Sequence, residues 1–254
     1  MSILLSGDFH ANAVGEISFI TKKNLIAKYG RDLFDTITYH IILGDGGFLW
    51  PGNEKTDAYN YKILARRPFP VLCVMGNHEP VLGRPELPEI DIGIGEKVIG
   101  VNENPLTAYL KRGKIYRIED WTFLVLGGAL SVDRAFRKPG KSWWEREYWT
   151  EDEKEALFDL LRERKNFDYV LTHTGPGRIN ELVFRTPYSG NTAKFSDEVA
   201  ALNERIDGGI TCKQWFCGHW HKDVYHYDEN RERGYQYLYK KTALLRKGEI
   251  IIRG

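Results

Sequence analysis

Five short apolar runs in this sequence each end in residues that can bind metal or move protons. The runs end in the segments GDFH, GDGG, GNHE, THTGP and GHWH, which carry Asp8, His10, Asp45, Asn77, His78, Glu79, His173, His219 and His221. Carboxylates, imidazoles and an amide oxygen suit borderline divalent ions such as Mn, Fe, Zn or Co. A single histidine of this kind has little meaning, because isolated histidines are mostly satisfied core or surface residues. Five such clusters together predict a metal site.

The histidines are concentrated in these clusters. The chain has 7 histidines, and only His40 and His226 fall outside the five segments. Ligands in open α/β sheets bind beyond the carboxyl ends of the strands, where several loops converge. If the apolar runs are strands, their polar ends can therefore meet and form one site.

The number of candidate ligands favours two metal ions. One ion takes about four protein ligands. The set offers more besides His78, namely Asp8, His10, Asp45, Asn77, His173, His219 and His221. Two ions that share a bridging carboxylate, roughly 3.5–4 Å apart, turn a water into hydroxide at neutral pH and clamp a phosphoryl group for in-line displacement. The chemistry expected of this set is hydrolysis of a phosphate ester.

The pattern around these clusters predicts an α/β fold. Short apolar runs predict buried strands at residues 2–6, 38–43, 69–75, 122–126, 169–172 and 214–217. Amphipathic stretches predict helices at residues 16–29, 55–66, 151–165 and 196–206. In the third helix, Thr150 is the expected N-cap before an acidic first turn.

Three other segments are expected to differ from this core. Residues 223–253 alternate around the turn-like segment LRKGE, which predicts antiparallel strands and hairpins. Residues 80–105 and 131–149 are expected to be irregular loops that face the substrate.

Length and composition restrict the class of protein. A chain of 254 residues holds one large domain with a full core and leaves little room for two, so residues 1–254 are expected to form a single domain. The net charge of +1 gives no overall field that would attract nucleic acid or an anionic membrane, although a local patch could bind a polyanion.

No apolar stretch is long enough to cross a bilayer. The N-terminus becomes polar too early for a signal peptide. The 3 cysteines are too few for a disulfide framework, which favours a cytoplasmic location.

The ordered motifs DxH, GD, GNH[DE], H and GHxH, which run from Asp8 to His221, resemble those of the calcineurin-like metallophosphoesterases. The resemblance implies a four-layer α/β/β/α sandwich with two metal ions at one sheet edge, Mn or Fe in the first place and Zn as the alternative. It implies that one ion is held by Asp8, His10 and His221, the other by Asn77, His173 and His219, with Asp45 bridging them.

The same resemblance makes His78 a neighbour of the metals rather than a ligand. From that position it can stabilise the transition state or protonate the leaving oxygen, as a general acid does. For Glu79 two roles stay open, direct catalysis or support of the ligands and backbone around it.

The sequence departs from the serine/threonine protein phosphatases of this family. Those enzymes extend the second motif to GDxxDRG and place an arginine after GNHE. Here Phe48 occupies the aspartate position, and Pro80 follows GNHE. The usual partner of the catalytic histidine and two phosphate-binding arginines are therefore missing from their expected places.

Contacts with the substrate are expected from the segment GGALSVDRAFRKPGKSWWERE instead. It carries Arg134 and Arg137, which could bind phosphate, followed by Trp143 and Trp144. The two indoles could stack on bases or could pack as core or lid residues. This segment contains GGA, then single Ser, Asp and Arg residues, and then SWW. The pattern is similar to one found in bacterial and phage members of the family.

These observations predict an enzyme in which metal-bound hydroxide attacks phosphorus and His78 assists the leaving group. The expected partner is a phosphate-ester substrate, and a nucleotide or small phosphodiester is favoured over a protein. No membrane partner is expected. One alternative is a phosphomonoesterase such as a serine/threonine protein phosphatase. Another is an inactive scaffold with this fold that binds proteins, which the filled ligand positions disfavour.

Overall fold

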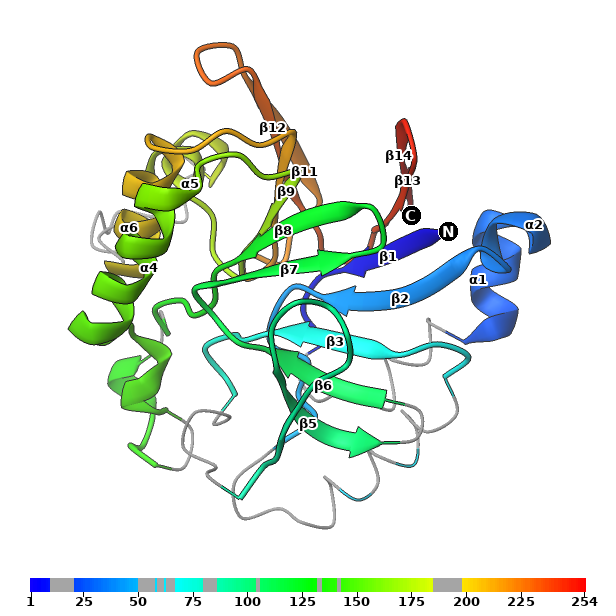
Figure 1. Cartoon of the computed structure of the whole chain (residues 1–254), viewed down its shortest axis with the longest axis horizontal. Coiled ribbons are helices and arrows are strands. Elements are labelled where there is room, and N and C mark those ends of the chain that lie inside the picture. The colour runs from blue at the N-terminus through cyan, green and yellow to red at the C-terminus, as the bar shows by residue number, and fades with distance from the viewer. Residues whose placement is uncertain are drawn as a thin grey trace.

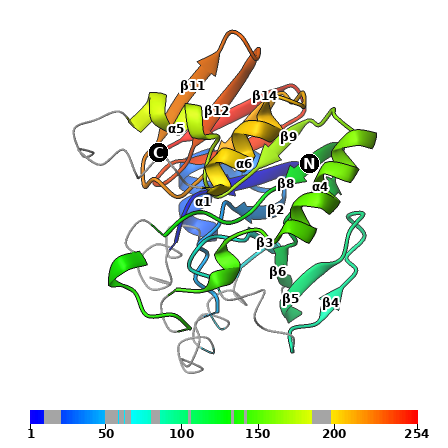
Figure 2. The same ribbon diagram turned by 90° about the vertical axis from the view of Figure 1, so that its left-hand side faces the viewer.

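Two β-sheets pack face to face and helices cover their outer faces. The computed structural model describes residues 1–9, 21–49, 58, 62, 67–79, 86–103, 106–131, 134–140, 143–184 and 198–254. Figure 1 shows α4, α5 and α6 on one side of the sheets and α1 and α2 on the other. In Figure 2, which is turned toward the first side, α4, α5 and α6 lie in front of the strands.

The larger sheet has eight strands among the described residues and is parallel at its centre. Its order is β14 (Glu249–Arg253), β13 (Thr242–Arg246), β1 (Ser2–Ser6), β2 (Ile37–Ile42), β3 (Val71–Val74), β6 (Leu106–Leu110), β5 (Val98–Glu103) and β4 (Glu89–Ile90). Neighbouring strands from β1 to β6 in this order run parallel. The carboxyl ends of β1, β2 and β3 therefore meet at one edge.

The smaller sheet has six strands in the described part of the chain. Its order is β11 (Val224–Asp228), β12 (Arg233–Tyr237), β10 (Gln214–Cys217), β9 (Tyr169–Leu171), β8 (Trp121–Val125) and β7 (Lys114–Ile118). The four central strands, from β12 to β8, run parallel to one another. Their carboxyl ends form a second common edge.

Three separate apolar clusters hold together four layers, two of helices and two of β-sheet. The first cluster lies between the sheets and joins side chains such as Leu5 and Leu72 of one sheet to Phe123 and Phe216 of the other. The second packs the larger sheet against α1 (Lys22–Tyr29) and α2 (Arg31–Phe34). The third packs the smaller sheet against α4 (Glu151–Glu163), α5 (Gly177–Phe184) and α6 (Glu198–Asp207). A sheet with apolar residues on both faces must be covered on both, which gives the α/β/β/α order.

The structure confirms most of the expected elements. All six strands are present, with ends that differ by one or two residues. The helix after Thr150 carries a complete capping box, in which the Thr150 hydroxyl accepts from the Glu153 N–H and the Glu153 carboxylate accepts from the Thr150 N–H. The C-terminal segment forms the antiparallel pairs β11–β12 and β13–β14. The helix expected at residues 55–66 falls almost wholly outside the described residues.

The prediction of an irregular loop over residues 80–105 was wrong from residue 89 onward. Strands β4 and β5 lie there, and β5 forms an antiparallel pair with β6. The prolines and glycines of this region indicate turns locally, but pairing with the neighbouring strands overrides that preference. Strands β6 and β7 and the helix α5 were also not anticipated. Residues 131–149 hold only two short 3₁₀ helices among their described residues, η3 (Arg134–Phe136) and η4 (Glu145–Glu147).

No helix among the described residues is long and apolar enough to cross a membrane.

Candidate metal centre

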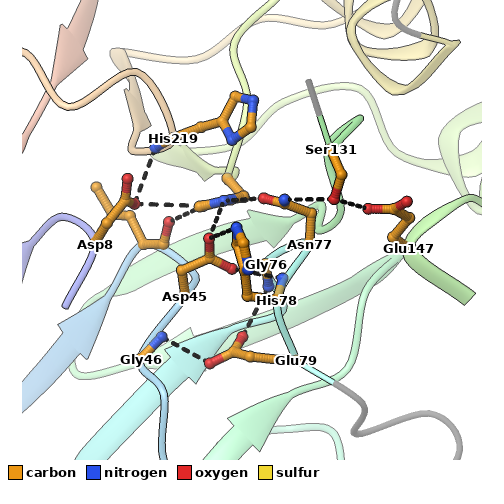
Figure 3. Close-up of polar contacts among 12 residues, drawn as sticks. Asp8, Asp45, Gly46, Gly76, Asn77, His78, Glu79, Ser131, Glu147 and His219 are labelled. Atoms are coloured by element: carbon orange, nitrogen blue, oxygen red, sulfur yellow. Dashed lines mark hydrogen bonds and ion pairs between the residues drawn. The ribbon is translucent and has the colours of Figure 1, made fainter. Parts of the chain in front are cut away.

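Figure 3 shows the candidate ligands Asp8, Asp45, Asn77 and His219 close to one another at the ends of strands from both sheets. Each described candidate ligand follows the carboxyl end of a strand, β1, β2 and β3 in the larger sheet and β9 and β10 in the smaller one. Their side chains contribute two carboxylates, one amide and imidazoles: Asp8, Asp45, Asn77, His173, His219 and His221. His10 lies outside the described residues, so the structure does not place it.

The imidazole of His173 lies at the centre of the group. Its Nδ1 donates to the backbone carbonyl of Leu43 at 2.8 Å, which fixes the ring and turns Nε2 toward the other ligands. Nε2 is 2.9 Å from Oδ1 of Asn77 and 3.3 Å from Oδ2 of Asp45. The ring of His219 lies beside it, with 4.9 Å between the ring centroids. The His173 side chain, which follows β9 of the smaller sheet, therefore contacts residues that follow strands of the larger sheet.

A second set of donors forms around Asp8. Its Oδ2 is 3.3 Å from Nε2 of His221, and its Oδ1 is 3.5 Å from Nδ1 of His173. The His221 ring is stacked on Tyr239, with 4.9 Å between centroids and 13° between planes. His221 is the outermost of the described ligands, since nearly half of its side chain is exposed.

These spacings fit donor atoms that share an ion. Atoms that each lie about 2.0–2.2 Å from a metal stand about 3.0–3.5 Å apart in tetrahedral or octahedral geometry. The distances around His173 Nε2 and between Asp8 and His221 fall in or close to that range. Among the described residues, His, Cys, Asp and Glu side chains alone do not form a group of three that could hold one ion.

The two carboxylates are buried and produce a strongly negative potential. Burial by itself disfavours a proton on His173, but the negative charges of Asp45 and Asp8 outweigh it and raise the pKa of His173 to about 10. Burial lowers the pKa of His219 well below its usual value, and the neighbouring His173 adds to that effect. A field that attracts a proton this strongly also attracts a metal cation.

Glycines before Asn77 and His219 allow the backbone to approach these carboxylates. A Cβ on Gly76 would lie 2.0 Å from Oδ1 of Asp45, and a Cβ on Gly218 would lie 2.4 Å from Oδ1 of Asp8. The space is used for hydrogen bonds. Oδ1 of Asp45 accepts from the His78 N–H and Oδ1 of Asp8 accepts from the His219 N–H, both at 2.9 Å. Each carboxylate is therefore anchored through one oxygen and presents the other to an imidazole.

The backbone is strained at three candidate ligands. Asp45, His219 and His221 have φ values of 50°, 69° and 50°, in the left-handed region that side chains other than glycine rarely adopt. Such conformations persist where the surrounding structure enforces them, and they are concentrated at functional sites. Here they direct the three side chains toward the shared edge.

Glu79 ties together the loops that carry Asp45 and Asn77. Its Oε1 accepts from the Gly46 N–H at 2.7 Å, the Gly47 N–H at 3.3 Å and the Tyr109 hydroxyl at 2.9 Å. Its Oε2 accepts from the Gly76 N–H at 2.8 Å. Of the two roles left open by the sequence, these contacts support the second, since the carboxylate is buried and its contacts are with backbone N–H groups, the Tyr109 hydroxyl and the Cys73 thiol.

A relay of side chains orients Asn77. The Asn77 amide nitrogen donates to the Ser131 hydroxyl at 2.9 Å, and that hydroxyl donates to Oε2 of Glu147 at 2.6 Å. Burial raises the pKa of Glu147 to about 8, and the hydrogen bonds from Ser131 oppose this rise. Because the amide nitrogen is engaged by Ser131, the amide oxygen faces His173. This orientation is the one a metal ligand requires.

His78 stands at the edge of the site with Arg137 against it. Its Nε2 is 3.7 Å from Oδ2 of Asp45, and its side chain is 17% exposed. The two terminal nitrogens of Arg137 lie 2.8 and 2.9 Å from the two ring nitrogens of His78. A neutral imidazole has one acceptor nitrogen, so only one of these contacts can be a hydrogen bond at a time. Phe48, at the position of the missing aspartate, is buried and packs on Tyr109.

Arg134 lies farther out than Arg137. Its guanidinium is 4.0 Å from the centroid of the Trp143 ring and 5.6 Å from that of Tyr148. Of the two arginines expected to bind substrate, Arg137 is thus held at the candidate centre through His78, while Arg134 is held by aromatic rings.

The sequence did not single out Ser131, Glu147 or Tyr239. Ser131 follows the carboxyl end of β8 and Tyr239 follows that of β12, both on the same edge as the predicted ligands. The rule that located the histidines, a polar residue directly after a strand, extends to Tyr239 but not to Ser131, which lies six residues beyond β8. Nothing in the sequence marked Glu147.

Comparison with known proteins shows the family of the chain. The chain matches the calcineurin-like phosphoesterase family over residues 1–223. No curated protein matches it. One crystal structure shares 12% identity at a TM-score of 0.59, with 99% of this chain and 97% of that chain covered.

Two further solved structures have TM-scores below 0.5. Phosphopantetheinyl hydrolase from Mycobacterium tuberculosis has 13% identity and a TM-score of 0.49, with 94% of this chain and 90% of that chain covered. A 5′-nucleotidase precursor from Thermus thermophilus has 12% identity and a TM-score of 0.45, with 100% and 53% covered.

The contacts of Glu79 predict a structural role that substitution can test. Glu79→Gln keeps the shape but places an amide N–H₂ against one of the backbone N–H donors, which should lower the free energy of unfolding by about 1–3 kcal/mol. Denaturant unfolding measures the change. Tyr109→Phe, which removes one donor and leaves the backbone contacts, should cost less. Unchanged stability of Glu79→Gln would contradict the role.

The Ser131 relay predicts an effect on metal affinity. Ser131→Ala removes the group that fixes the Asn77 amide, so the affinity for Mn(II) should fall about 10–100-fold, as for other residues that orient metal ligands. Calorimetric titration measures it. Ser131→Thr keeps the hydroxyl and should restore most of the affinity. An alanine variant that binds Mn(II) as tightly as the native protein would show that the relay does not position Asn77.

Proposed function

Because the chain belongs to the calcineurin-like phosphoesterase family and is a hydrolase of phosphate esters, we propose that it is a dinuclear metal-dependent phosphoesterase that acts on phosphodiesters. The convergence of Asp8, Asp45, Asn77 and three histidines on one sheet edge supports this most directly. The whole chain is proposed to form one domain, since strands from both of its ends pair in the larger sheet.

The proposed ligand sets are those that the family resemblance implies. Asp8 and His221, with His10, are assigned to one ion. Asn77 and His173, with His219, are assigned to the other, and Asp45 is assigned to both. Ions bound there activate water and neutralise charge on the phosphoryl group. Mn or Fe is proposed in the first place, and the donor set also suits Zn.

His78 is proposed to act on the substrate rather than to bind metal. Its backbone N–H is held by Asp45 and its ring by Arg137, so the imidazole is fixed beside the ligand set while part of it stays accessible. From there it can donate a hydrogen bond to the phosphoryl group or a proton to the leaving oxygen. Arg137 can contact a phosphoryl oxygen from the same place.

A diester is proposed over a protein phosphomonoester because of the charges available. The dianionic phosphoryl group of a monoester calls for more cationic groups than a monoanionic diester. Phe48 and Pro80 stand where protein phosphatases have charged partners, and Phe48 is buried. Arg137 is the cation placed against His78 in the described part of the chain.

Metal analysis tests the dinuclear assignment. The purified protein should contain about two equivalents of Mn, Fe or Zn per chain, and Asp45→Ala should lose at least one, because that carboxylate is assigned to both ions. Elemental analysis measures this. Asp35→Ala removes an exposed carboxylate that pairs with Arg31 and should leave the content unchanged. Low metal content that Asp45→Ala does not alter and that reconstitution does not raise would favour the inactive scaffold.

Hydrolysis of two chromogenic esters tests the reaction. With added Mn(II), bis-p-nitrophenyl phosphate should be turned over faster than p-nitrophenyl phosphate. His78→Ala should lower kcat by about 10²–10⁴-fold while the metal content is kept. His226→Ala, whose ring packs near Tyr235, is the matched histidine control. Turnover of the monoester alone would contradict the diesterase assignment, and full activity of His78→Ala would contradict its role.

A further inference from the structure

A cavity of about 630 Å³ opens beside the candidate metal centre. Its wall includes Leu130, Arg134 and Trp143, the segments 145–146 and 148–150, and Glu198 at the start of α6. None of these residues belongs to the proposed ligand sets.

Residues of the cavity wall are neighbours in sequence of Ser131 and Glu147, which form hydrogen bonds that lead to the candidate ligand Asn77. Leu130 in the wall precedes Ser131, whose hydroxyl contacts Asn77. Glu147, between wall residues Arg146 and Tyr148, contacts the same hydroxyl. The cavity wall therefore adjoins the residues that orient Asn77.

The wall presents flat surfaces suited to stacking. The Arg134 guanidinium lies over the Trp143 ring and near that of Tyr148, and its Nη1 donates to the Tyr148 hydroxyl at 3.1 Å. Trp149 is fixed by a hydrogen bond from its Nε1 to the Gly127 carbonyl at 2.9 Å. Nucleobases stack on aromatic rings and on guanidinium planes of this kind.

The charges of the cavity do not favour a phosphate. Arg134 and Arg146 face a lining that also contains Glu145 and Glu198, so the four formal charges cancel. The N-terminus of α4 borders the cavity, but its cap is closed within the chain by Thr150 and Glu153. Arg146 is itself paired with Glu153 at 3.1 Å. A planar, uncharged group with both hydrogen-bond donors and acceptors fits this lining better than an anion does.

We propose that this cavity binds the nucleobase of a nucleotide phosphodiester whose phosphate lies at the metal centre, with Trp143 as the principal stacking residue. The inference rests on the proposed function for the position of the phosphate. It adds a substrate class and a residue that determines specificity.

Two p-nitrophenyl phosphodiesters with the same leaving group test the proposal. One is the 5′-ester of thymidine and the other is the 5′-ester of the corresponding abasic deoxyribose. The thymidine ester should have a kcat/KM about tenfold higher or more, the effect of one stacked base. In Trp143→Ala this ratio should fall to near one, and Trp143→Phe should restore most of it. Trp144→Ala changes the neighbouring indole, which does not line the cavity, and should keep the native ratio.

Equal kcat/KM values for the two esters, or a preference that survives Trp143→Ala, would overturn the proposal. Binding of thymidine itself to the metal-loaded protein, measured by calorimetry, separates this inference from the reaction. If neither ester is hydrolysed, the proposed function fails. Thymidine binding that is lost in Trp143→Ala would still support the base site, and absence of binding to the native protein would overturn it.

Discussion

The contact of His173 with Asp45 and Asp8 is the interaction on which the rest of the site depends. His173 follows a strand of the smaller sheet, and the two carboxylates follow strands of the larger one. The side chain is completely buried, and the Leu43 carbonyl accepts a hydrogen bond from it. The relative position of the sheets therefore sets the geometry of the ligands, and a shift between the sheets would separate them.

Two buried carboxylates this close are costly unless positive charge lies nearby. The raised pKa of His173 shows that the field is strong, and a bound cation satisfies it as well as a proton does. The fold supports this arrangement with groups outside the ligand set. Glu79 links the loops after β2 and β3, Ser131 fixes the Asn77 amide, and glycines let the backbone donate to each carboxylate. The strained backbone at Asp45 and His219 is held in place by these contacts.

The sequence predicted the part of this design that is local. A polar cluster directly after an apolar run is visible without a structure, so Asp8, Asp45 and His173 could be assigned to one edge. The supporting contacts were not visible in this way, because Glu79 meets Gly46 and Asn77 meets Ser131 only after distant loops are brought together. Strands β4 to β7 were missed for a different reason. Prolines and glycines around β4 and β5 indicate turns, although β4 pairs with β5, β5 with β6 and β7 with β8, and β6 joins the larger sheet through β3.

The segment from Leu130 to Thr150 connects the chemistry to the choice of substrate. Ser131 and Glu147 orient a proposed metal ligand, Arg137 holds His78, and Arg134 and Trp143 line the cavity. These roles fall on one stretch with little regular secondary structure, so its residues can change without altering either sheet. A metal ion requires its ligands to be placed to within a few tenths of an ångström. In the proposed site, the two sheets fix the positions of the candidate ligands. A family that keeps this edge and varies this segment can keep one reaction and direct it to different esters.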